Sequence, residues 1–401
     1  MRIAIFDEIM ETHVNASLAR ALRALGHEVI LTGKVWKGFT PPTEQKAKHG
    51  IFLQLQKLVN QEIDALLCMR SSSLTAEHLQ YLRSQGVVTA VWFNDDPVLY
   101  KLCTAAVAPH YDITLHTGDS RTLALYEDTL GVRGATFPFW CDAVDFPHRY
   151  DAELAQHDLV FVGYMHNHVK RWRFSWLQEA VTAGVDLIAY GKTHDEDRAD
   201  FAVGDLPMDD VAATLPEFRA GFNISQQFAD YDGTEFDYPQ LRELGEFPIP
   251  SRVVQFAAVG LPVITLRMPG DNGPLWESQF PEVVGIRTPA ELATLLDEWR
   301  AHPEQRASIA AATYARWQRD FSADARARLL VDLLSDPGRL RTLSRTERAT
   351  LFANYCGQYA RPGLPAIVRR FRVRIRHRLA VVRRRSRRLL GAMRRSLYRR
   401  N

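Results

Sequence analysis

The chain has 401 residues, which is more than one ordinary domain holds and predicts two domains. Hydrophobic residues make up 46% of it, enough to build two sizeable cores. Its four cysteines, Cys68, Cys103, Cys141 and Cys356, are far apart and form no C-x-x-C pair, which indicates free thiols in a reducing compartment. The N-terminus lacks a signal-peptide core, and no apolar run reaches the roughly 18 residues of a membrane span. We therefore expect a cytoplasmic protein.

The net charge of +3 conceals an uneven distribution. Residues 361–401 contain 16 Arg and no Asp, Glu or Lys, which leaves 34 of the 50 basic residues against all 47 acidic ones in residues 1–360. An acidic body thus carries a basic tail. Such a tail is typical of proteins that contact a polyanion, either a membrane surface or a nucleic acid.

The first part of the chain alternates short apolar runs with amphipathic ones. Strands are expected at 2–6, 28–33, 63–69, 87–93, 111–118 and 134–139. Helices are expected at 14–27, near 51–61, from Thr75 and from Asp119. The first helix places Leu18, Leu22 and Leu25 on one stripe, and Gly26 ends it. Short apolar strands separated by helices predict βαβ units and a parallel sheet.

A polar stretch at 140–158 interrupts this pattern, which then resumes. Strands are expected at 158–164, 185–191, 218–225, 261–266 and 283–288, and helices at 168–183, 251–260, from Pro289 and from Pro303. We predict two α/β domains, 1–150 and 151–335, then a helical connection at 336–360 and the tail at 361–401. Because such sheets bind ligands beyond the carboxyl ends of their strands, a cleft between the domains is expected.

Two segments leave alternatives open. Residues 229–250 have no apolar period and predict a long loop, which is either ligand-related or disordered. In the tail, the apolar side chains at helical spacing are Ile367, Phe371, Ile375, Leu379 and Val382. This stripe among arginines is typical of a helix lying on anionic lipid. A solvated tail and a nucleic-acid-binding tail are the other interpretations, although aromatic residues for base stacking are few.

The helix expected at 251–260 has an unusual start. Ser251 is a good N-cap residue, but Arg252 falls in the first turn, where the helix dipole disfavours a cation. An anionic ligand at this helix end would explain it. Gln255 lies one turn later on the same face, and Gly260 ends the helix before a buried strand. A surface polar residue is the alternative interpretation of Gln255.

The segment "SRVVQFAAVGLPVIT" resembles the S-R-x-x-E-x-x-A-x-G-x-P-V-I-T stretch of GT-B glycosyltransferases, and is most similar to the CgeB-like branch of the family 1/4-type enzymes. Five more segments resemble that family: "DLVFVGYMHNHVKR", "FRAGFNIS", "AVWFNDDP", the run from residue 111 to 147 and the helical run from residue 291 to 334. The resemblance covers about residues 1–334. It implies a GT-B fold of two Rossmann-like domains, with the donor bound by the second domain and the acceptor by the first.

The resemblance also implies the donor site. Its candidate donor-binding residues here are Gly163, Lys170, Arg171, Asn223, Ser225, Arg252 and Gln255. Relatives usually have Glu at the position of Gln255, where the carboxylate holds ribose hydroxyls. Glutamine keeps an acceptor and a donor but loses the charge-assisted bond, a difference of roughly 1 kcal/mol. Lys170 and Arg171 are alternatively a plain exposed helix start.

Candidate bases for an acceptor hydroxyl lie in the first half. Asp95 and Asp96 follow a buried strand, and either could accept a proton or cap the next helix. His13, after the first strand, and His116 are further candidates. His166 and His168 lack a carboxylate or cysteine at ligand spacing, so no metal site is expected. Motifs of serine hydrolases, P-loop enzymes and dinucleotide dehydrogenases are missing from the sequence.

These features predict a glycosyltransferase that moves a sugar from a nucleotide-diphosphate donor to an acceptor hydroxyl. No cofactor and no metal are expected, and the acceptor is predicted to be a saccharide or lipid-linked glycan of the cell envelope. The tail would hold the enzyme at the inner face of an anionic membrane. The alternative is a catalytically inactive GT-B fold that binds glycans or acts as a scaffold, docked through its tail to membrane or nucleic acid.

Overall fold

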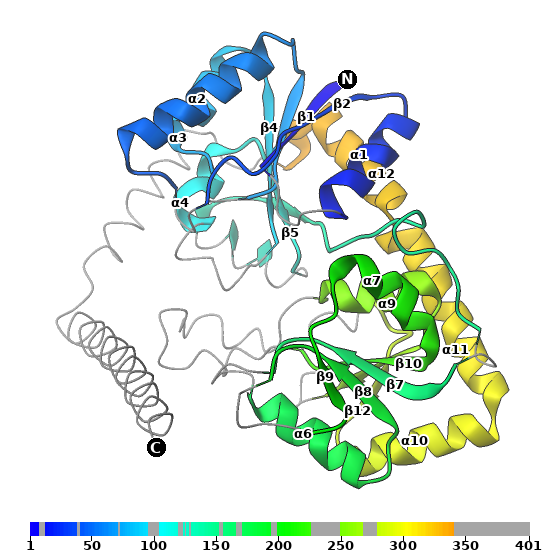
Figure 1. Cartoon of the computed structure of the whole chain (residues 1–401). Coiled ribbons are helices and arrows are strands. Elements are labelled where there is room, and N and C mark those ends of the chain that lie inside the picture. The colour runs from blue at the N-terminus through cyan, green and yellow to red at the C-terminus, as the bar shows by residue number, and fades with distance from the viewer. Residues whose placement is uncertain are drawn as a thin grey trace, which may run out of the picture. The chain divides into compact units, whose positions relative to one another are not determined.

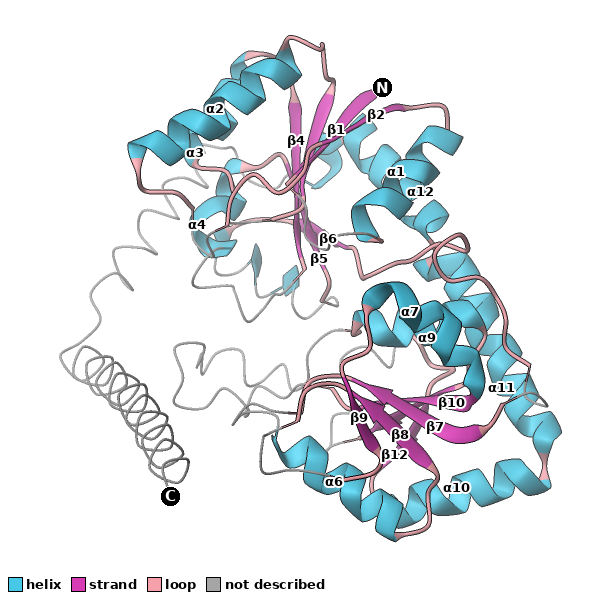
Figure 2. Cartoon of the chain, viewed as in Figure 1, coloured by secondary structure: helices cyan, strands magenta, loops and turns pink. Residues whose placement is uncertain are grey.

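A computed structural model describes residues 1–7, 13–37, 41–70, 73–94, 104–118, 123–124, 126–127, 130–151, 155–165, 171–193, 199–225, 249–267 and 279–340. Met1–Ala349 forms one compact unit of the chain. Within it, the described strands make two six-stranded sheets (Figures 1 and 2). The basic tail and most of the predicted helical connection lie outside the described residues, so those predictions stay open.

The first sheet is parallel throughout. Its strands, in spatial order, are β2 (Glu28–Leu31), β1 (Arg2–Phe6), β3 (Ala65–Cys68), β4 (Val88–Phe93), β5 (Ile113–His116) and β6 (Gly134–Thr136). Helices α2 (Gln45–Val59) and α3 (Ala76–Ser84) cover one face, and α1 (Val14–Ala24) lies on the other (Figure 1). A short helix, α4 (Ala105–Val107), and a 3-10 turn, Ala108–His110, precede β5.

The second sheet is also parallel. Its order is β12 (Val284–Ile286), β11 (Val263–Leu266), β10 (Phe218–Asn223), β7 (His157–Val162), β8 (Leu187–Tyr190) and β9 (Ala202–Gly204). Helices α6 (Arg171–Thr182) and α10 (Pro289–Ala301) pack on one face through an apolar cluster. On the opposite face lie α7 (Met208–Thr214) and α9 (Ser251–Val259) (Figure 2). A parallel sheet with helices on both faces confirms the predicted Rossmann-like architecture of this half.

The C-terminal helices of the described chain connect the two sheets. Helix α11 (Pro303–Arg316) continues into a π-helical turn, Trp317–Phe321, and Ser322 caps α12 (Ala323–Ser335) by accepting a hydrogen bond from the Ala325 amide. A 3-10 turn, Pro337–Leu340, follows. Although the sequence placed α12 with the second domain, its apolar stripe of Ala327, Leu330 and Leu334 belongs to the core of the first sheet, beside α1.

Two elements of the second half are missing from the sequence-based expectation. Strand β9 has three residues, and α7 follows it after a short polar segment, "DLP". Strand β9 pairs with β8 only after a register shift at Ala189 and Tyr190. Elements this short give too little periodicity to be recognised from one sequence. Helix α7 proves important, because its first residues contact two of the candidate site residues.

Gly191, at the end of β8, has a φ of 146°, and a Cβ atom there would overlap the carbonyl oxygen of Gly163. The backbones that follow β7 and β8 are therefore too close together for a side chain at Gly191. We expect Gly191→Ala to lower the free energy of unfolding by ~1–3 kcal/mol. Gly184→Ala is the matched control, because Gly184 also has a positive φ, 93°, but open space around it. Urea denaturation should show the larger loss in Gly191→Ala, and equal losses would contradict the backbone clash.

Candidate functional site

Helix α9 is held tightly on the second sheet. It begins after Pro250 and ends at Gly260, whose left-handed φ of 94° suits a helix C-terminus. All seven residues from Val253 to Val259 are buried. Phe256 lies directly on Gly221 of β10, where a Cβ atom would overlap its ring. This close packing fixes the helix start, with Arg252, in relation to the carboxyl ends of the strands.

Arg252 and Gln255 contact one another on α9. The Arg252 Nη1 donates to the Gln255 Oε1 at 2.5 Å. Burial disfavours the charged guanidinium and lowers the pKa of Arg252 to about 10. Among the described residues no carboxylate pairs with Arg252, so its only recorded partner there is a neutral amide. A partly buried cation of this kind, in the first turn of a helix, is suited to an anionic ligand.

Gln255 is buried, with 5% of its surface exposed. Its Nε2 lies 3.9 Å from the Met208 Sδ at the start of α7. The amide oxygen is thus directed to Arg252 and the amide nitrogen to a weakly accepting thioether. A sugar hydroxyl could replace the sulfur contact at little cost, because the exchange gains a normal hydrogen bond.

We expect Gln255→Glu to strengthen binding of a nucleotide diphosphate sugar by about 1 kcal/mol, or roughly fivefold, because a carboxylate accepts charge-assisted bonds from hydroxyls. Titration calorimetry with the best donor measures this, and Gln255→Ala is the companion variant that removes the acceptor. An unchanged affinity would contradict the expectation and show that the new carboxylate is taken up by an ion pair with Arg252.

Polar side chains also lie at the carboxyl ends of two central strands. Asn223, the last residue of β10, donates from Nδ2 to the Ser225 Oγ and to the Thr265 Oγ1, each at 3.0 Å. All three are buried. Both amide hydrogens of Asn223 are therefore used within the protein, which fixes the ends of β10 and β11 beside each other. Asn223 and Ser225 were predicted donor-binding residues, and that role stays a prediction.

Of the remaining predicted donor-binding residues, Gly163 follows β7, and its amide donates to the Tyr190 carbonyl at 2.9 Å. Its neighbour Gly191 was not recognised from sequence, although a glycine ending an apolar strand was the visible feature. Arg171 is the first residue of α6, and its side chain is not described. Lys170 lies outside the described residues.

His13 immediately precedes α1 and is surrounded by carboxylates. Its Nδ1 lies 3.3 Å from the Asp145 Oδ2, and its Nε2 lies 3.7 Å from the Asp209 Oδ1. The ring meets Phe146 edge-on, with centroids 5.5 Å apart, and the side chain is 16% exposed. Both ring nitrogens are buried and form no hydrogen bond within the described part of the chain, so each faces its carboxylate at ion-pair distance only. An imidazole beside a carboxylate is an arrangement found in general bases.

Asp145 is itself held in place. Arg20 of α1 donates from Nε to the Asp142 Oδ2 at 2.7 Å and from Nη2 to the Asp145 Oδ2. The Asp142 Oδ1 accepts from the Asp145 amide at 2.9 Å. The side chain of Asp145 is only 15% exposed, so this network is shielded from solvent. Such support keeps one oxygen of Asp145 directed at His13.

The start of α7 contacts both groups of residues. Asp209 approaches His13, and Met208, its neighbour in the chain, approaches Gln255. The structure thus brings together His13 of the first half and the Arg252–Gln255 pair of the second. Sequence reasoning missed Asp145, Met208 and Asp209. The acidic pair Asp209–Asp210 in a short segment was the one visible feature, and it also suits an ordinary helix start.

The other candidate bases differ in their outcome. Asp95 and Asp96 lie outside the described residues, so their role stays a prediction. His116 ends β5 and is 1% exposed, between the rings of Phe93 and Tyr126. Burial lowers its pKa to about 3, which makes it a weak base that stays neutral at physiological pH. Cys68 and Cys141 are free buried thiols, and Cys103 and Cys356 lie outside the described residues.

A metal site was not expected from the sequence. Within the described ranges, no three His, Cys, Asp or Glu side chains are grouped so that they could hold a metal ion. His166 and His168 lie outside these ranges. No described helix combines the length and the apolar character needed to cross a membrane.

The chain was compared with protein families, with curated proteins and with solved structures. Residues 170–332 match the family described as "Glycosyl transferase-like". None of the curated proteins matches the chain. The fold is similar to that of sucrose-phosphate synthase from Thermosynechococcus elongatus, with 14% identity, 84% of this chain and 99% of that chain covered, and a TM-score of 0.52. A glycosyltransferase from Rickettsia africae ESF-5 is similar at 9% identity, with 84% and 98% covered and a TM-score of 0.51.

The fold is therefore that of GT-B proteins, with two Rossmann-like halves as expected. The matched segment runs from α6 into α12, up to residue 332, and includes the Arg252–Gln255 pair. Together, domain and fold support a glycosyltransferase, with the type of sugar left open.

Proposed function

We propose that this protein transfers a sugar from a nucleotide-diphosphate donor to an acceptor hydroxyl, with Arg252 and the start of α9 as the diphosphate site. One observation supports this most directly: Arg252 lies in the first turn of α9 with its pKa lowered by burial, and its recorded partner is a neutral amide. A helix N-terminus and a guanidinium together bind phosphate oxygens well. This place also lies within the matched glycosyl transferase-like segment.

In the proposed mechanism His13 accepts the proton of the acceptor hydroxyl through Nε2, while Asp145 stabilises the imidazolium through Nδ1. The acceptor oxygen forms a bond to the anomeric carbon as the bond to the diphosphate oxygen breaks. Negative charge then grows on the leaving diphosphate, where Arg252 and the α9 dipole stabilise it. Because a fixed cation is already there, we propose that the reaction is metal-independent.

Titration of the full chain with UDP, GDP, ADP and dTDP, and with the corresponding sugar nucleotides, tests the donor site. We expect at least one of them to bind and its sugar to reach water or an added acceptor. Absence of heat with every nucleotide would overturn the donor-site proposal. The CgeB-like branch remains part of this proposal and depends on the sequence resemblance. The cell-envelope acceptor and the position at the inner face of a membrane depend on the basic tail.

The second candidate is a GT-B fold without activity that binds glycans or acts as a scaffold. The observation that favours it is Gln255, whose amide oxygen is already engaged by Arg252. Donor binding without hydrolysis or transfer, across a panel of sugar nucleotides and acceptors, would support this candidate. Slow sugar-nucleotide hydrolysis by the purified chain would exclude it.

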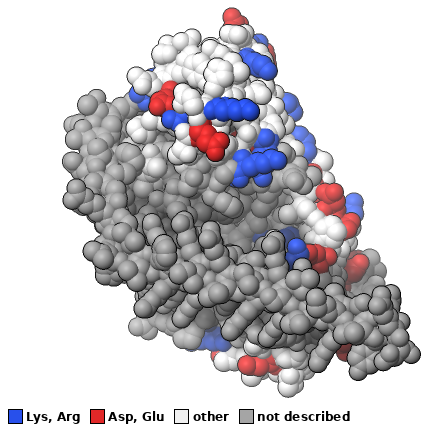
Figure 3. All heavy atoms as spheres, turned by 60° about the vertical axis from the view of Figure 1, so that its left-hand side comes forward, with Lys and Arg blue, Asp and Glu red and all other residues white. Residues whose placement is uncertain are grey.

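The basic tail is proposed to hold the protein at an anionic membrane. Its 16 arginines are not balanced by any acidic residue within 361–401. By contrast, basic and acidic side chains are interspersed on the described surface in Figure 3. We expect the full chain to float with vesicles containing phosphatidylglycerol and to stop floating after removal of 361–401, because polybasic segments bind anionic lipid by about 1 kcal/mol per charge. Flotation of the truncated chain, or of neither, would contradict this role.

A further inference from the structure

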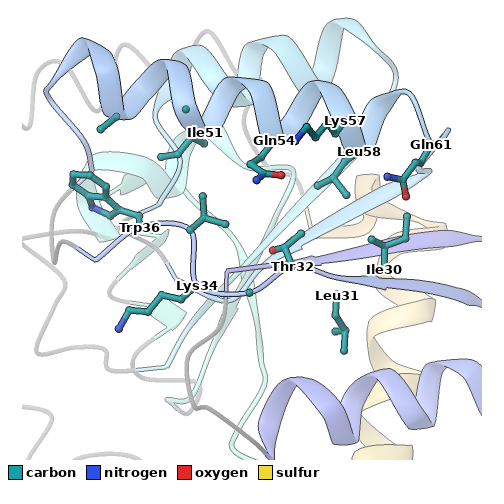
Figure 4. Close-up of a pocket in the computed structure, with 14 residues that line it drawn as sticks. Ile30, Leu31, Thr32, Lys34, Trp36, Ile51, Gln54, Lys57, Leu58 and Gln61 are labelled. Carbon is teal, nitrogen blue, oxygen red and sulfur yellow. The ribbon is translucent and has the colours of Figure 1, made fainter.

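A groove of about 700 Å³ lies between helix α2 and the edge strand β2 (Figure 4). This volume is in the range of about 300–1,000 Å³ that small-molecule sites occupy. Its polar and aromatic lining comes from Thr32, Lys34, Trp36, Gln54, Lys57 and Gln61. No Asp or Glu is among its lining residues. None of these side chains belongs to the candidate site around His13, Arg252 and Gln255.

The groove results from how α2 packs. Ile51, Leu55 and Leu58 bury one stripe of the helix in the first half, while Gln54 and Lys57 remain exposed on the next. Strand β2 is the edge of its sheet, so no further strand closes the space beside it. In Figure 4, Gln54 points from the helix toward the strand, and Thr32 points up toward it.

The wall of the groove is firmly built. The segment after β2 is attached to Asp7, a fully buried residue at the end of β1 with a left-handed φ of 62°. The Asp7 amide donates to the Thr32 Oγ1, and its Oδ1 accepts from the Val35 amide, each at 2.9 Å. Ser73 donates to its other oxygen. A buried carboxylate in a strained backbone conformation is retained where surrounding structure fixes it, often at binding sites.

Trp36 is fixed from the same side. Arg70, which follows β3 and lies 4.0 Å from the Asp7 carboxylate, donates from Nη1 to the Trp36 carbonyl at 2.8 Å. The backbone bearing the indole is therefore positioned before any ligand arrives, which lowers the entropic cost of binding. The held segment follows the carboxyl end of β2, the side of an α/β sheet at which ligands bind.

The lining chemistry defines the ligand. A half-buried indole presents an apolar face, and the amides of Gln54 and Gln61 donate and accept hydrogen bonds. Sugar rings have an apolar face and a rim of hydroxyls, which these groups complement. Lys34 and Lys57 are exposed and have no carboxylate partner among the described residues. They favour a negatively charged chain.

We propose that this groove binds an anionic oligosaccharide. The bound sugars would be the part of the acceptor that lies away from its reacting hydroxyl. The acceptor role depends on the proposed transferase function, whereas the binding itself does not. A bound chain would extend from the groove, past the end of β2, and present its terminus to the transfer site. The groove would thereby select for a charged acceptor.

The test applies the full chain to a panel of oligosaccharides of equal length that carry uronate, phosphate or no charge, with a single-stranded oligonucleotide added. We expect an anionic glycan to bind, with affinity about tenfold lower in Trp36→Ala and in Gln54→Ala, a loss typical of a central contact. Binding should weaken in Lys57→Gln and with added salt. Lys46→Gln is the matched control, an exposed lysine of α2 outside the groove.

Gln54→Ala keeps the proposal testable if Trp36→Ala unfolds, because Gln54 is exposed on a helix where alanine is well tolerated. The proposal is overturned if the unchanged chain binds no anionic glycan more tightly than the groove variants do. It is also overturned if uncharged glycans bind as tightly as anionic ones, or if the oligonucleotide binds more tightly than any glycan. Donor titration is measured separately. If a donor binds but no glycan binding depends on the groove, this inference is overturned and the transferase proposal stands. If a glycan binds in the groove but no donor binds, the transferase proposal is overturned and the glycan site stands.

Discussion

Arg252→Met is expected to abolish most donor binding without lowering stability. Loss of a charge-assisted bond to phosphate weakens binding by ~1.5–3 kcal/mol, or roughly 10- to 150-fold. In the ligand-free fold, burial lowers the pKa of Arg252 from its usual value to about 10, so the charged form is disfavoured. Below pH 10 the side chain is charged in both folded and unfolded states, and this cost is fully present. It is relieved only as the pH rises from about 10 toward the pKa of the unfolded chain.

Calorimetric titration of the best nucleotide, together with thermal unfolding at pH 7.5, measures both parts of this expectation. Arg287→Met is the matched control, because Arg287 is exposed after β12 in the same half and contacts the Glu291 carboxylate through its backbone amide, which the substitution keeps. Arg252→Lys should recover only part of the affinity, since lysine lacks the planar fork. A large fall in thermal midpoint with unchanged nucleotide binding would show that Arg252 has a structural role instead.

His13→Gln is expected to lower kcat by about 10²- to 10⁴-fold, the usual contribution of a positioned general base, while leaving the donor dissociation constant unchanged. The reason is that His13 lies in the first half, near Asp145, and the donor is held by α9. Transfer rates at saturating donor and acceptor, with nucleotide titration in parallel, separate the two quantities.

His49→Gln is the control, an exposed histidine on α2. Asp145→Asn should show a smaller loss than His13→Gln, because it leaves the imidazole but removes the charge that stabilises its protonated form. Full activity in His13→Gln would transfer the role of base to Asp95 or Asp96, which follow β4 in the sequence. Equal loss of donor binding and turnover would indicate that His13 supports the fold.

The alternating pattern predicted every described strand except β9, because each is a short apolar run between helices, whereas β9 and α7 are too short and polar to stand out. The Arg252–Gln255 contact was predictable, since both residues lie one turn apart on a single helix.

The contacts of His13 were not predictable. They join α1 to Asp145 and to Asp209, which are far from it in the sequence and come together only through tertiary packing. Nor could the sequence indicate that α12 crosses to the first sheet, since its stripe of alanine and leucine would suit either core. Periodicity reports which face of an element is buried, but not the element against which it is buried.

The placement of α12 has a consequence for how the two halves depend on each other. Leu330, Leu333 and Leu334 complete the core around α1, although they come at the end of the described chain. A fragment ending at residue 150 would therefore leave that apolar surface open to water. We therefore expect such a fragment to be less stable than the same residues within the full chain. During synthesis the core of the first half therefore stays incomplete until α12, which follows the second half in the sequence, has left the ribosome.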